Sequence, residues 1–251
     1  MVEENHSYSD VIGNSQMPYL NSLASKYGLA TQYFANTHPS IGNYFMLTTG
    51  QVVTNDDHFQ GVVDADNIVR ELGNAGKTWR SYTQSAPGPG YTGDGPYPYG
   101  KAHNPFSYFS DVVNSSTQTA NLVPFSQFAT DMASGQLPAF SFIAPDLLHD
   151  AHDGTLSQAD TWLQQNIGPL ISNPVFNNSL LIIVFDESEL FDIFNGGGNV
   201  AAVIVSPKAK SGYRSTNLYQ HQSTLRLILR ALGVPGLPGA AANAPDMGEF
   251  F

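Results

Sequence analysis

The sequence contains no cysteine. Disulfide bonds, zinc–thiolate sites and a cysteine nucleophile are therefore all excluded. Any metal ion that this protein binds would have to be held by oxygen atoms or by imidazole nitrogens, because these are the donors that the remaining side chains provide.

Basic residues are scarce. The 251-residue chain has 10 Lys and Arg against 21 Asp and Glu, which gives a formal net charge of −11. No basic cluster interrupts this balance, so the phosphate backbone of a nucleic acid would be repelled. The composition therefore argues against a nucleic-acid partner.

Long apolar runs are absent as well. The longest run, Leu180–Phe185, fits a buried strand and falls far short of the roughly 20 residues that span a bilayer. We therefore expect no transmembrane segment. At 41% hydrophobic and 12% aromatic residues, the chain can still bury a sizeable core.

The chain begins abruptly with Met1-Val2-Glu3-Glu4-Asn5 and shows no signal peptide. A buried first strand would normally need more residues before Glu4, so we interpret the opening as that of a fragment with a truncated first strand. We expect a secreted or periplasmic protein whose signal peptide has been removed.

Apolar, β-rich runs alternate with helical patterns along the chain. Strands are expected at Leu29–Phe34, Thr78–Thr83, Ala139–Ala144, Leu180–Phe185 and Val200–Ser206. Helices are expected at Pro18–Tyr27, Asp66–Leu72, Leu156–Ile171 and Tyr219–Leu232. This alternation predicts a single α/β domain over residues 1–251, with a mainly parallel sheet covered by helices on both faces.

Ligands of such sheets bind beyond the carboxyl ends of the strands, which is where chemistry-bearing residues should be sought. The long loop at residues 85–105 is rich in Gly, Pro and Tyr. We expect it to lie on the surface near that edge of the sheet as a lid-like segment.

Two acidic segments each follow a predicted strand. Glu3-Glu4-Asn5 ends the opening strand, and Asp186-Glu187 follows the most hydrophobic strand of the chain. Carboxylate and amide oxygens suit a hard divalent cation, which would offset the cost of adjacent buried acids. The alternatives are a solvated acidic turn for the first segment, and capping or Arg-paired acids for the second.

Ser40 lies in the segment His38-Pro39-Ser40-Ile41-Gly42-Asn43, between a predicted strand and a helical pattern. A serine at a helix N-terminus has backbone N–H groups and the positive end of the helix dipole beside it. Both favour a bound phosphate and a deprotonated hydroxyl. The alternative is that Ser40 is an ordinary N-cap residue.

Two histidines, His149 and His152, follow the predicted strand Ala139–Ala144 and are each followed by an acid. They could donate to phosphate oxygens or protonate a leaving group, and zinc ligation is the alternative. His103 closes the long loop and could reach the same site. We interpret His221 as a capping or packing residue.

Together, these segments resemble the phosphoesterase family that includes bacterial and plant non-specific phospholipases C and a group of acid phosphatases. The similar segments, in the family's order, are Glu4–Tyr8, Pro39–Asn43, His103–Phe106, Leu137–Ile143 with His149–Asp153, Phe185–Glu187 and the glycines Gly196–Gly198. The resemblance covers essentially the whole chain, and its motifs fall at predicted strand ends.

The resemblance implies an alkaline-phosphatase-like three-layer α/β/α sandwich. It further implies Ser40, His149 and His152 as catalytic residues, Asn43, His103 and Asp153 as substrate contacts, and Glu4, Asn5, Asp186 and Glu187 as ligands of one divalent metal ion. All-oxygen ligands favour Ca²⁺, Mg²⁺ or Mn²⁺, and the nearby histidines leave Zn²⁺ and Fe open.

The function expected from these residues is metal-dependent hydrolysis of a small phosphate ester through a phosphoserine at Ser40. The His103-Asn104-Pro105-Phe106 segment favours an acid-phosphatase-like phosphomonoesterase, whereas the apolar segment Leu190–Phe194 keeps a phospholipase C-type phosphodiesterase as the alternative.

Two further alternatives remain. The protein could be a catalytically silent metal-binding scaffold. Two features suggest this alternative: the first strand is short, and position 199 is Asn where relatives carry His or Arg. A sulfuryl hydrolase is disfavoured by the absence of Cys and of a Ser-x-Pro-x-Arg segment. The pattern indicates no particular oligomeric state.

Overall fold

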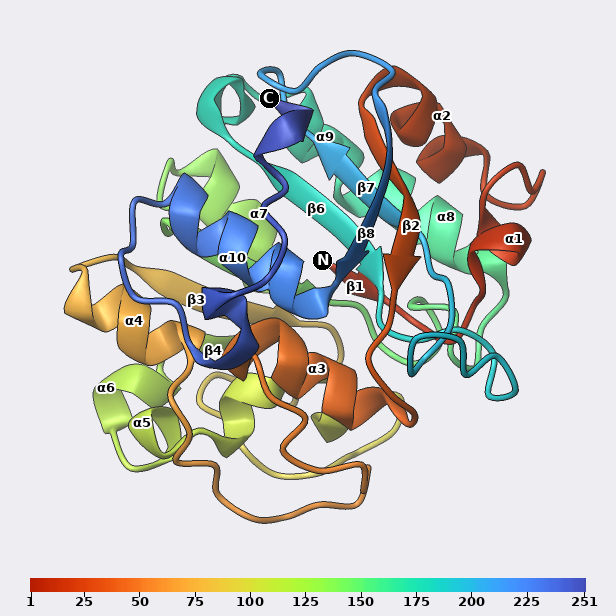
Figure 1. The fold of residues 1–251 in the computed structure, drawn as a ribbon. Helices are drawn as coiled ribbons and strands as arrows, with labels where there is room; N and C mark the ends of the chain where they lie inside the picture. The colour runs from red at the N-terminus through yellow and green to blue at the C-terminus, as the bar shows by residue number, and fades with distance from the viewer.

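The computed structural model describes residues 1–251 as an α/β protein with two β-sheets (Figure 1). The strands are β1 (Val2–Glu3), β2 (Gly28–Phe34), β3 (Trp79–Thr83), β4 (Leu122–Pro124), β5 (Phe140–Ala144), β6 (Leu181–Phe185), β7 (Ala202–Val205) and β8 (Arg214–Gln220).

The α-helices are α1 (Tyr8–Val11), α2 (Pro18–Lys26), α3 (Ser40–Thr49), α4 (Ile68–Asn74), α5 (Ser110–Val113), α6 (Ser116–Thr119), α7 (Ser126–Ala133), α8 (Leu156–Asn166), α9 (Gly168–Ile171) and α10 (His221–Ala231). Short 3₁₀ helices lie at Lys101–His103, Pro105–Tyr108, Pro174–Asn178, Gly239–Ala242 and Gly248–Phe250.

The larger sheet has the strand order β1-β6-β7-β2-β8, and the smaller sheet has the order β4-β3-β5. Strand β7 is antiparallel to both of its neighbours, whereas the other pairings are parallel. Strand β5 contacts β1, so the smaller sheet lies at the β1 edge of the larger one. The carboxyl ends of β1, β6, β2 and β8 consequently face one edge of the sheet.

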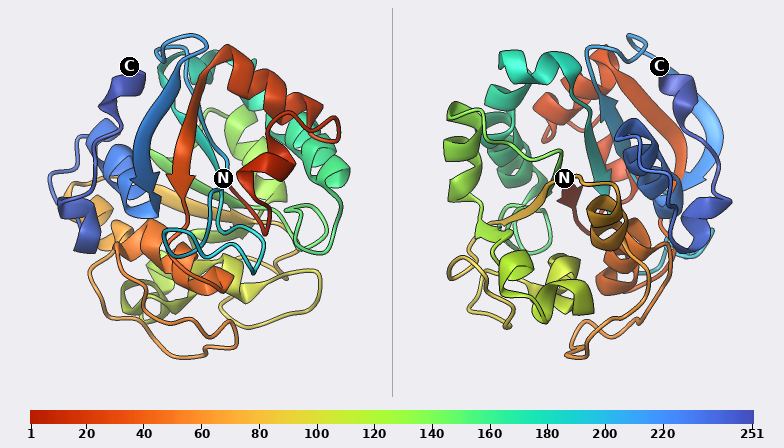
Figure 2. Two further views of the ribbon diagram at one scale, coloured as in Figure 1. Left: turned by 45° about the vertical axis from the view of Figure 1, so that its right-hand side comes forward. Right: turned by 90° about the vertical axis from the view of Figure 1, so that its left-hand side faces the viewer.

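Helices lie on both sides of the sheets (Figure 2). On one side, α2 packs on α8 and against β2 and β7. On the other side, α10 packs on α3 and α4. The predicted α/β class is confirmed, and the larger sheet is mixed because of the reversed strand β7.

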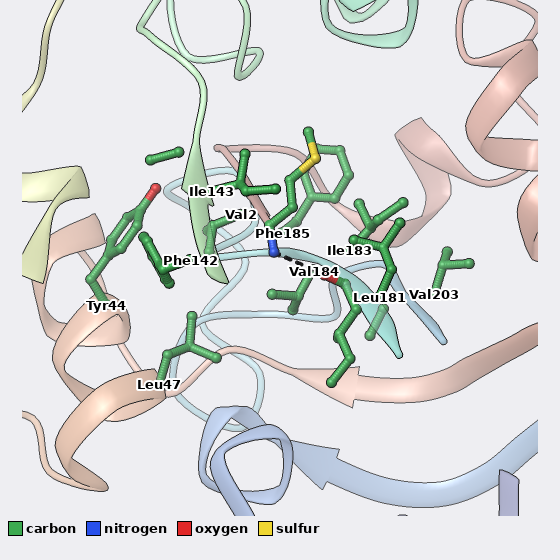
Figure 3. Close-up of a cluster of buried hydrophobic side chains, with 14 of the residues drawn as sticks. Val2, Tyr44, Leu47, Phe142, Ile143, Leu181, Ile183, Val184, Phe185 and Val203 are labelled. Carbon is green, nitrogen blue, oxygen red and sulfur yellow. Dashed lines mark hydrogen bonds between the residues drawn. The ribbon is translucent and has the colours of Figure 1, made fainter. Parts of the chain in front are cut away.

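The core is centred on β6, all of whose residues are buried. A run of five apolar residues is expected for a strand that is covered on both faces. Figure 3 shows Tyr44 and Leu47 of α3 and Phe142 of β5 gathered around Val2 and this strand. The core thus joins the two sheets and α3 directly behind the edge where the carboxyl ends of the strands meet.

The five predicted strands are all present, with ends that agree within two residues. The prediction missed β4, which has three residues, and β8, an edge strand with four exposed residues out of seven. Neither strand has the continuous apolar run or the regular alternation that marks a buried strand.

Three predicted segments need correction. The helix expected over Leu156–Ile171 is two helices, because Pro169 at the start of α9 cannot continue α8. The helix expected from Tyr219 begins at His221, since Tyr219 belongs to β8. Part of the lid-like loop 85–105 is not on the surface, because His103 and its neighbours form a buried 3₁₀ turn.

None of the helices is both long enough and apolar enough to cross a bilayer.

Glu249 near the C-terminus attaches the last turn of the chain to β8. Its carboxylate accepts hydrogen bonds from the hydroxyls of Tyr213 at 3.1 Å and Tyr219 at 2.7 Å, from Nδ2 of Asn217 at 2.8 Å, and from Ser215. Burial disfavours its charged form, but the hydrogen bonds from Ser215 and Tyr219 outweigh this effect and lower the pKa of Glu249.

We predict that Glu249→Gln lowers the free energy of unfolding by about 1–2 kcal/mol at pH 7, because a charged acceptor of several hydrogen bonds is lost. The pKa of Glu249 is lower in the folded than in the unfolded chain. Its stabilisation is therefore complete above the unfolded-state pKa of roughly 4.3 and is lost as the pH falls through the folded-state pKa.

Urea unfolding at pH 7 and pH 3 measures this effect, with Glu189→Gln as a control at an exposed acid whose carboxylate accepts no hydrogen bond. Equal stability of Glu249→Gln and the unmodified protein at pH 7 would contradict the prediction.

Candidate active site

The parallel register of β1 and β6 brings the two acidic segments together. Glu3 lies opposite Phe185, and the N–H of Asp186 donates to the carbonyl oxygen of Glu3 at 2.9 Å. The chain therefore continues beyond the two strand ends in parallel, and Glu4 after β1 lies close to Glu187 after β6. Both strands end at the same edge, as expected for parallel neighbours.

Only one residue of the Glu3-Glu4 pair faces the site, because neighbouring side chains of a strand point to opposite faces. Both carboxyl oxygens of Glu3 are buried without a hydrogen-bond partner. Burial and the nearby charge of Asp150 raise the pKa of Glu3 well above its usual value, which favours the neutral form of this carboxyl. Glu4 is the acid that reaches the cluster.

Ser40 lies at the centre of this cluster. Its hydroxyl is buried and donates to Oε2 of Glu4 at 2.9 Å, with Oε1 of Glu187 at 3.3 Å. Ser40 is the first residue of α3, and the N-cap is Pro39. The Ser40 side chain points at the carboxylates and makes no capping bond, which argues against the alternative of an ordinary N-cap serine.

The carboxylates around Ser40 crowd each other. Burial and the charge of Glu4 raise the pKa of Glu187 to about 7, and burial with the charges of Glu4 and Glu187 raises the pKa of Asp186 well above its usual value. Oδ2 of Asp186 is buried with no hydrogen-bond partner. Buried acids packed in this way are costly unless a cation compensates them.

Asn5 links the two acidic segments. Its backbone has a φ of 56°, a left-handed conformation that asparagine tolerates better than most residues. Its N–H donates to Oδ1 of Asp186 at 3.3 Å, and its Nδ2 lies 2.9 Å from Nδ1 of His152. Asn5 therefore lies between the carboxylates and the histidines.

Two histidines lie on the other side of Glu4. Nε2 of His103 is 3.3 Å from Oε1 of Glu4, and Nδ1 of His152 is 3.4 Å from Oε2. Ligand atoms of the three side chains lie within 4.8 Å of one another and could hold a metal ion. Tyr44 completes this side, since its hydroxyl donates to Oε1 of Glu4 at 2.6 Å and its ring stacks on His103.

Both histidines have a raised pKa, which favours the protonated, positively charged form of the ring. Burial would lower the pKa of His103, but the charge of Glu4 and the hydrogen bond with Asp150 outweigh it and raise the pKa to about 9. The hydrogen bond with Glu4 raises the pKa of His152, against the opposing effect of its partial burial. The two rings can therefore also donate hydrogen bonds to an anion at this site.

Asp150 supports the site and was missed by the sequence prediction. Its Oδ2 is 3.0 Å from Nδ1 of His103, its Oδ1 accepts from the N–H of His152 at 2.8 Å, and its carbonyl oxygen accepts from the N–H of Glu4 at 2.8 Å. One buried residue thus orients both histidines and Glu4. Its position between the predicted His149 and His152 was the only available signal in the sequence.

His38 was also missed. Its Nδ1 lies 2.8 Å from Oε2 of Glu187, and its Nε2 lies 3.0 Å from the carbonyl oxygen of Asp192. It therefore connects the carboxylate cluster to the loop between β6 and β7. His38 lies two residues before Ser40 in the sequence. No local sequence pattern predicts its contact with Glu187, which follows β6 much later in the chain.

The structure does not bring two predicted residues to this cluster. Nδ1 of His149 is 2.6 Å from Oδ1 of Asp146 and 3.1 Å from Nε2 of Gln84, and the ring lines a separate polar hollow beside α8. Asp153 is exposed, and its backbone N–H donates to the carbonyl oxygen of Leu147. Neither side chain makes a hydrogen bond to the residues around Ser40.

Asn43 is buried, and its side chain is engaged with the backbone. Its Oδ1 accepts from the N–H groups of Asn36 at 2.9 Å and Thr37 at 3.2 Å, and its Nδ2 donates to the carbonyl oxygen of Thr37 at 2.8 Å. Asn43 therefore holds the turn from β2 into α3, which sets the position of Ser40.

The predicted glycines pack against the same turn. A Cβ atom on Gly197 would lie 2.4 Å from the carbonyl oxygen of Thr37, and one on Gly196 would lie 2.1 Å from that of Asn36. Gly196 also has a φ of 113°, which L-residues rarely adopt. Only glycine allows these two backbone segments to approach so closely.

His221 has the packing role that the sequence predicted. It is buried, and its Nε2 lies 2.5 Å from the carbonyl oxygen of Asp186. Burial lowers the pKa of His221 to about 4, so the ring is neutral near pH 7 and donates to this carbonyl oxygen. It thereby fixes the backbone of a carboxylate that faces Ser40.

Comparisons with known proteins identify relatives of this chain. The model of the Phosphoesterase family matches residues 11–235. The chain is 31% identical to a phosphatidylinositol-3-phosphatase of Mycobacterium tuberculosis, over 100% of this chain and 81% of that protein. It is 30% identical to a probable acid phosphatase of Kluyveromyces lactis, over 93% of this chain but only 57% of that longer protein.

The fold also resembles solved structures. A protein of the alkaline phosphatase superfamily from Vibrio parahaemolyticus superimposes with a TM-score of 0.67 at 11% identity, over 99% of this chain and 70% of that one. At this identity the likeness shows the fold alone. The family resemblance noted in the sequence is confirmed: the chain belongs to the phosphoesterase family, a family of phosphoric ester hydrolases.

Proposed function

We propose that this protein hydrolyses phosphate monoesters in a metal-dependent reaction, with Ser40 as the nucleophile. The observation that supports this most directly is the position of the Ser40 hydroxyl, buried at the N-terminus of α3 between Glu4 and Glu187. A hydroxyl there combines a negatively charged proton acceptor with the positive end of a helix dipole, and both favour a nucleophilic oxygen.

The proposed metal ligands are Glu4, Asn5, Asp186 and Glu187. The unpaired Oδ2 of Asp186 and the raised pKa values of Asp186 and Glu187 support a cation at this place. When bound, a divalent ion would supply positive charge to the serine oxygen and to the phosphate. The oxygen donors favour Ca²⁺, Mg²⁺ or Mn²⁺, and the two histidines beside Glu4 keep Zn²⁺ and Fe as possible ions.

In the proposed reaction, Oγ of Ser40 attacks phosphorus and the bond to the alcohol oxygen breaks, which leaves a phosphoserine. Before the attack, the Ser40 hydroxyl donates its proton in a hydrogen bond to Oε2 of Glu4, and Glu4 can accept this proton. Water then attacks the phosphoserine, the Ser40–phosphorus bond breaks, and inorganic phosphate and the free hydroxyl are released.

We assign the acid that protonates the leaving alcohol to His152 rather than His149. His152 is exposed on its outer side and lies 3.4 Å from Glu4, whereas His149 is bonded to Asp146 and Gln84. His103, held between Asp150 and Glu4, is the proposed donor to the phosphate oxygens. Asn43 and Asp153 retain no direct substrate contact in this proposal, because the Asn43 side chain is bonded to the backbone and Asp153 is exposed away from the cluster.

The monoester preference rests on the His103-Asn-Pro-Phe segment and on the relatives, which are named as acid phosphatases and a phosphatidylinositol-3-phosphatase. A phospholipase C-type phosphodiesterase is the second candidate. The observation that favours it is the exposed apolar segment Leu190–Phe194 close to the site.

We also propose that residues 1–251 act as one domain, a three-layer sandwich with a mainly parallel central layer formed by the two sheets. One hydrophobic core drawn from both sheets, and helices on both sides, support this description. We retain an exported location as part of the proposal, and the acidic composition is compatible with it.

The first prediction from the proposed function concerns the metal. The protein should hydrolyse p-nitrophenyl phosphate, lose this activity on treatment with a chelator, and regain it with one added divalent ion, because the acids around Ser40 require a cation. The phosphocholine diester of p-nitrophenol should be a poorer substrate. No turnover of either ester by folded protein that is still stabilised by metal would instead indicate a silent metal-binding scaffold.

The second prediction concerns the nucleophile. Ser40→Ala should lower kcat by about a thousandfold or more, since the Tyr44 hydroxyl contacts the other oxygen of Glu4 and cannot replace it. The carboxylates remain, so metal binding measured by calorimetry should persist. Ser22→Ala, at an exposed position of α2, serves as the control. Full activity in Ser40→Ala would show that the nucleophile is a different group.

The third prediction separates the two histidines. His152→Gln should slow hydrolysis of phenyl phosphate by about a hundredfold, and that of p-nitrophenyl phosphate less, because the poorer leaving group depends more on protonation. His149→Gln should leave both rates unchanged. Similar losses in the two variants, measured as kcat on each ester, would refute the assignment of the acid to His152.

A further inference from the structure

The loop between β6 and β7 exposes a cluster of large apolar side chains. Leu190 is 66% exposed, Phe191 93%, Ile193 71% and Phe194 66%, and these are the four most exposed large apolar residues of the chain. Scattered single apolar residues on a surface are ordinary, but four within five positions concentrate exposed apolar area in one loop. We call residues 189–194 the apolar loop.

The backbone of the apolar loop is held in place by its own polar groups. Asp192 accepts hydrogen bonds from the N–H of Phe194 at 3.1 Å and from the N–H of Asn199 at 3.2 Å. The hydroxyl of Ser188 donates to the carbonyl oxygen of Asp192 at 3.1 Å. The exposure of the apolar side chains is therefore a feature of the folded loop, which presents them outward.

The apolar loop lies beside the active site. The carbonyl oxygen of Asp192 is 3.0 Å from Nε2 of His38, and the other nitrogen of that ring is 2.8 Å from Glu187. In Figure 1 the loop, drawn in cyan, extends beyond the carboxyl end of β6 at the same edge of the molecule as α3. A partner that covers the loop would therefore reach the rim of the site.

We propose that the apolar loop docks on a zwitterionic phospholipid surface and so brings Ser40 to phosphate esters displayed in that surface. A rigid protein or a second copy of this chain seated here would obstruct the approach to the rim of the site. A lipid surface, by contrast, presents phosphate groups next to an apolar layer that the Phe and Leu side chains can enter.

The negative charge of the protein favours a zwitterionic lipid surface over an anionic one. The chain carries a formal net charge of −11, and Glu189 and Asp192 lie within the loop itself. An anionic surface would repel this face, whereas a zwitterionic surface would not. The choice of a lipid surface rests on the proposed phosphate-ester chemistry, because that chemistry requires the site to stay accessible while the loop is covered.

The test is co-sedimentation with phosphatidylcholine vesicles. The unmodified protein should bind the vesicles, with little dependence on salt. The double variant Leu190→Ser/Phe191→Ser should bind at least tenfold more weakly, because interfacial binding scales with the buried apolar area. The matched control, Val175→Ser/Leu218→Ser, removes two exposed apolar side chains outside the loop and should bind like the unmodified protein.

An activity measurement accompanies the binding. Turnover of soluble p-nitrophenyl phosphate should be the same in all three proteins, since neither double variant alters the residues around Ser40. Turnover of phosphatidate, dispersed at a low fraction in phosphatidylcholine vesicles, should fall in Leu190→Ser/Phe191→Ser alone. Vesicle binding without any turnover would refute the proposed function but uphold the docking surface.

Three outcomes would overturn the docking proposal. The unmodified protein could fail to bind the vesicles, or the double variant could bind them as strongly. Sedimentation velocity could also show a dimer that Leu190→Ser/Phe191→Ser dissociates, without any vesicle binding. In that case a second copy of the chain, and not a lipid surface, covers the apolar loop.

Discussion

The parallel pairing of β1 with β6 is the contact on which the candidate active site depends. It consists of only two residue pairs, yet it places Glu4 beside Asp186 and Glu187, which lie more than 180 positions later in the chain. Ser40 then enters from a third strand end and donates to Glu4. A shift of one residue in this register would turn Glu4 to the other face of the sheet, where Glu3 now lies buried.

The rest of the site compensates for the cost of gathering acids in a buried place. His103, His152 and Tyr44 surround Glu4 with donors, and His38 contacts Glu187. Asp186 keeps one oxygen without a partner. The arrangement is therefore complete on the side of Glu4 and incomplete on the side of Asp186, which is where a cation best relieves the remaining repulsion.

Much of the fold and part of the site could be predicted from the sequence. The five long strands are apolar enough to be recognised locally, and Ser40, Glu4 and the Asp186-Glu187 pair follow such strands. Strand β8 was missed because it is an edge strand with mostly exposed polar residues. His38 and Asp150 were missed because their importance lies in contacts with residues more than 45 positions away.

The sequence by itself determined the α/β class, the family and the strand ends at which the candidate site lies, because apolar runs and the polar residues that follow them are local patterns. The tertiary structure decided which of two neighbouring histidines reaches the site. His149 and His152 are three residues apart, but Ala151 between them has a φ of 75° and turns the backbone. His152 consequently contacts Glu4 while His149 contacts Asp146, and no local pattern distinguishes them.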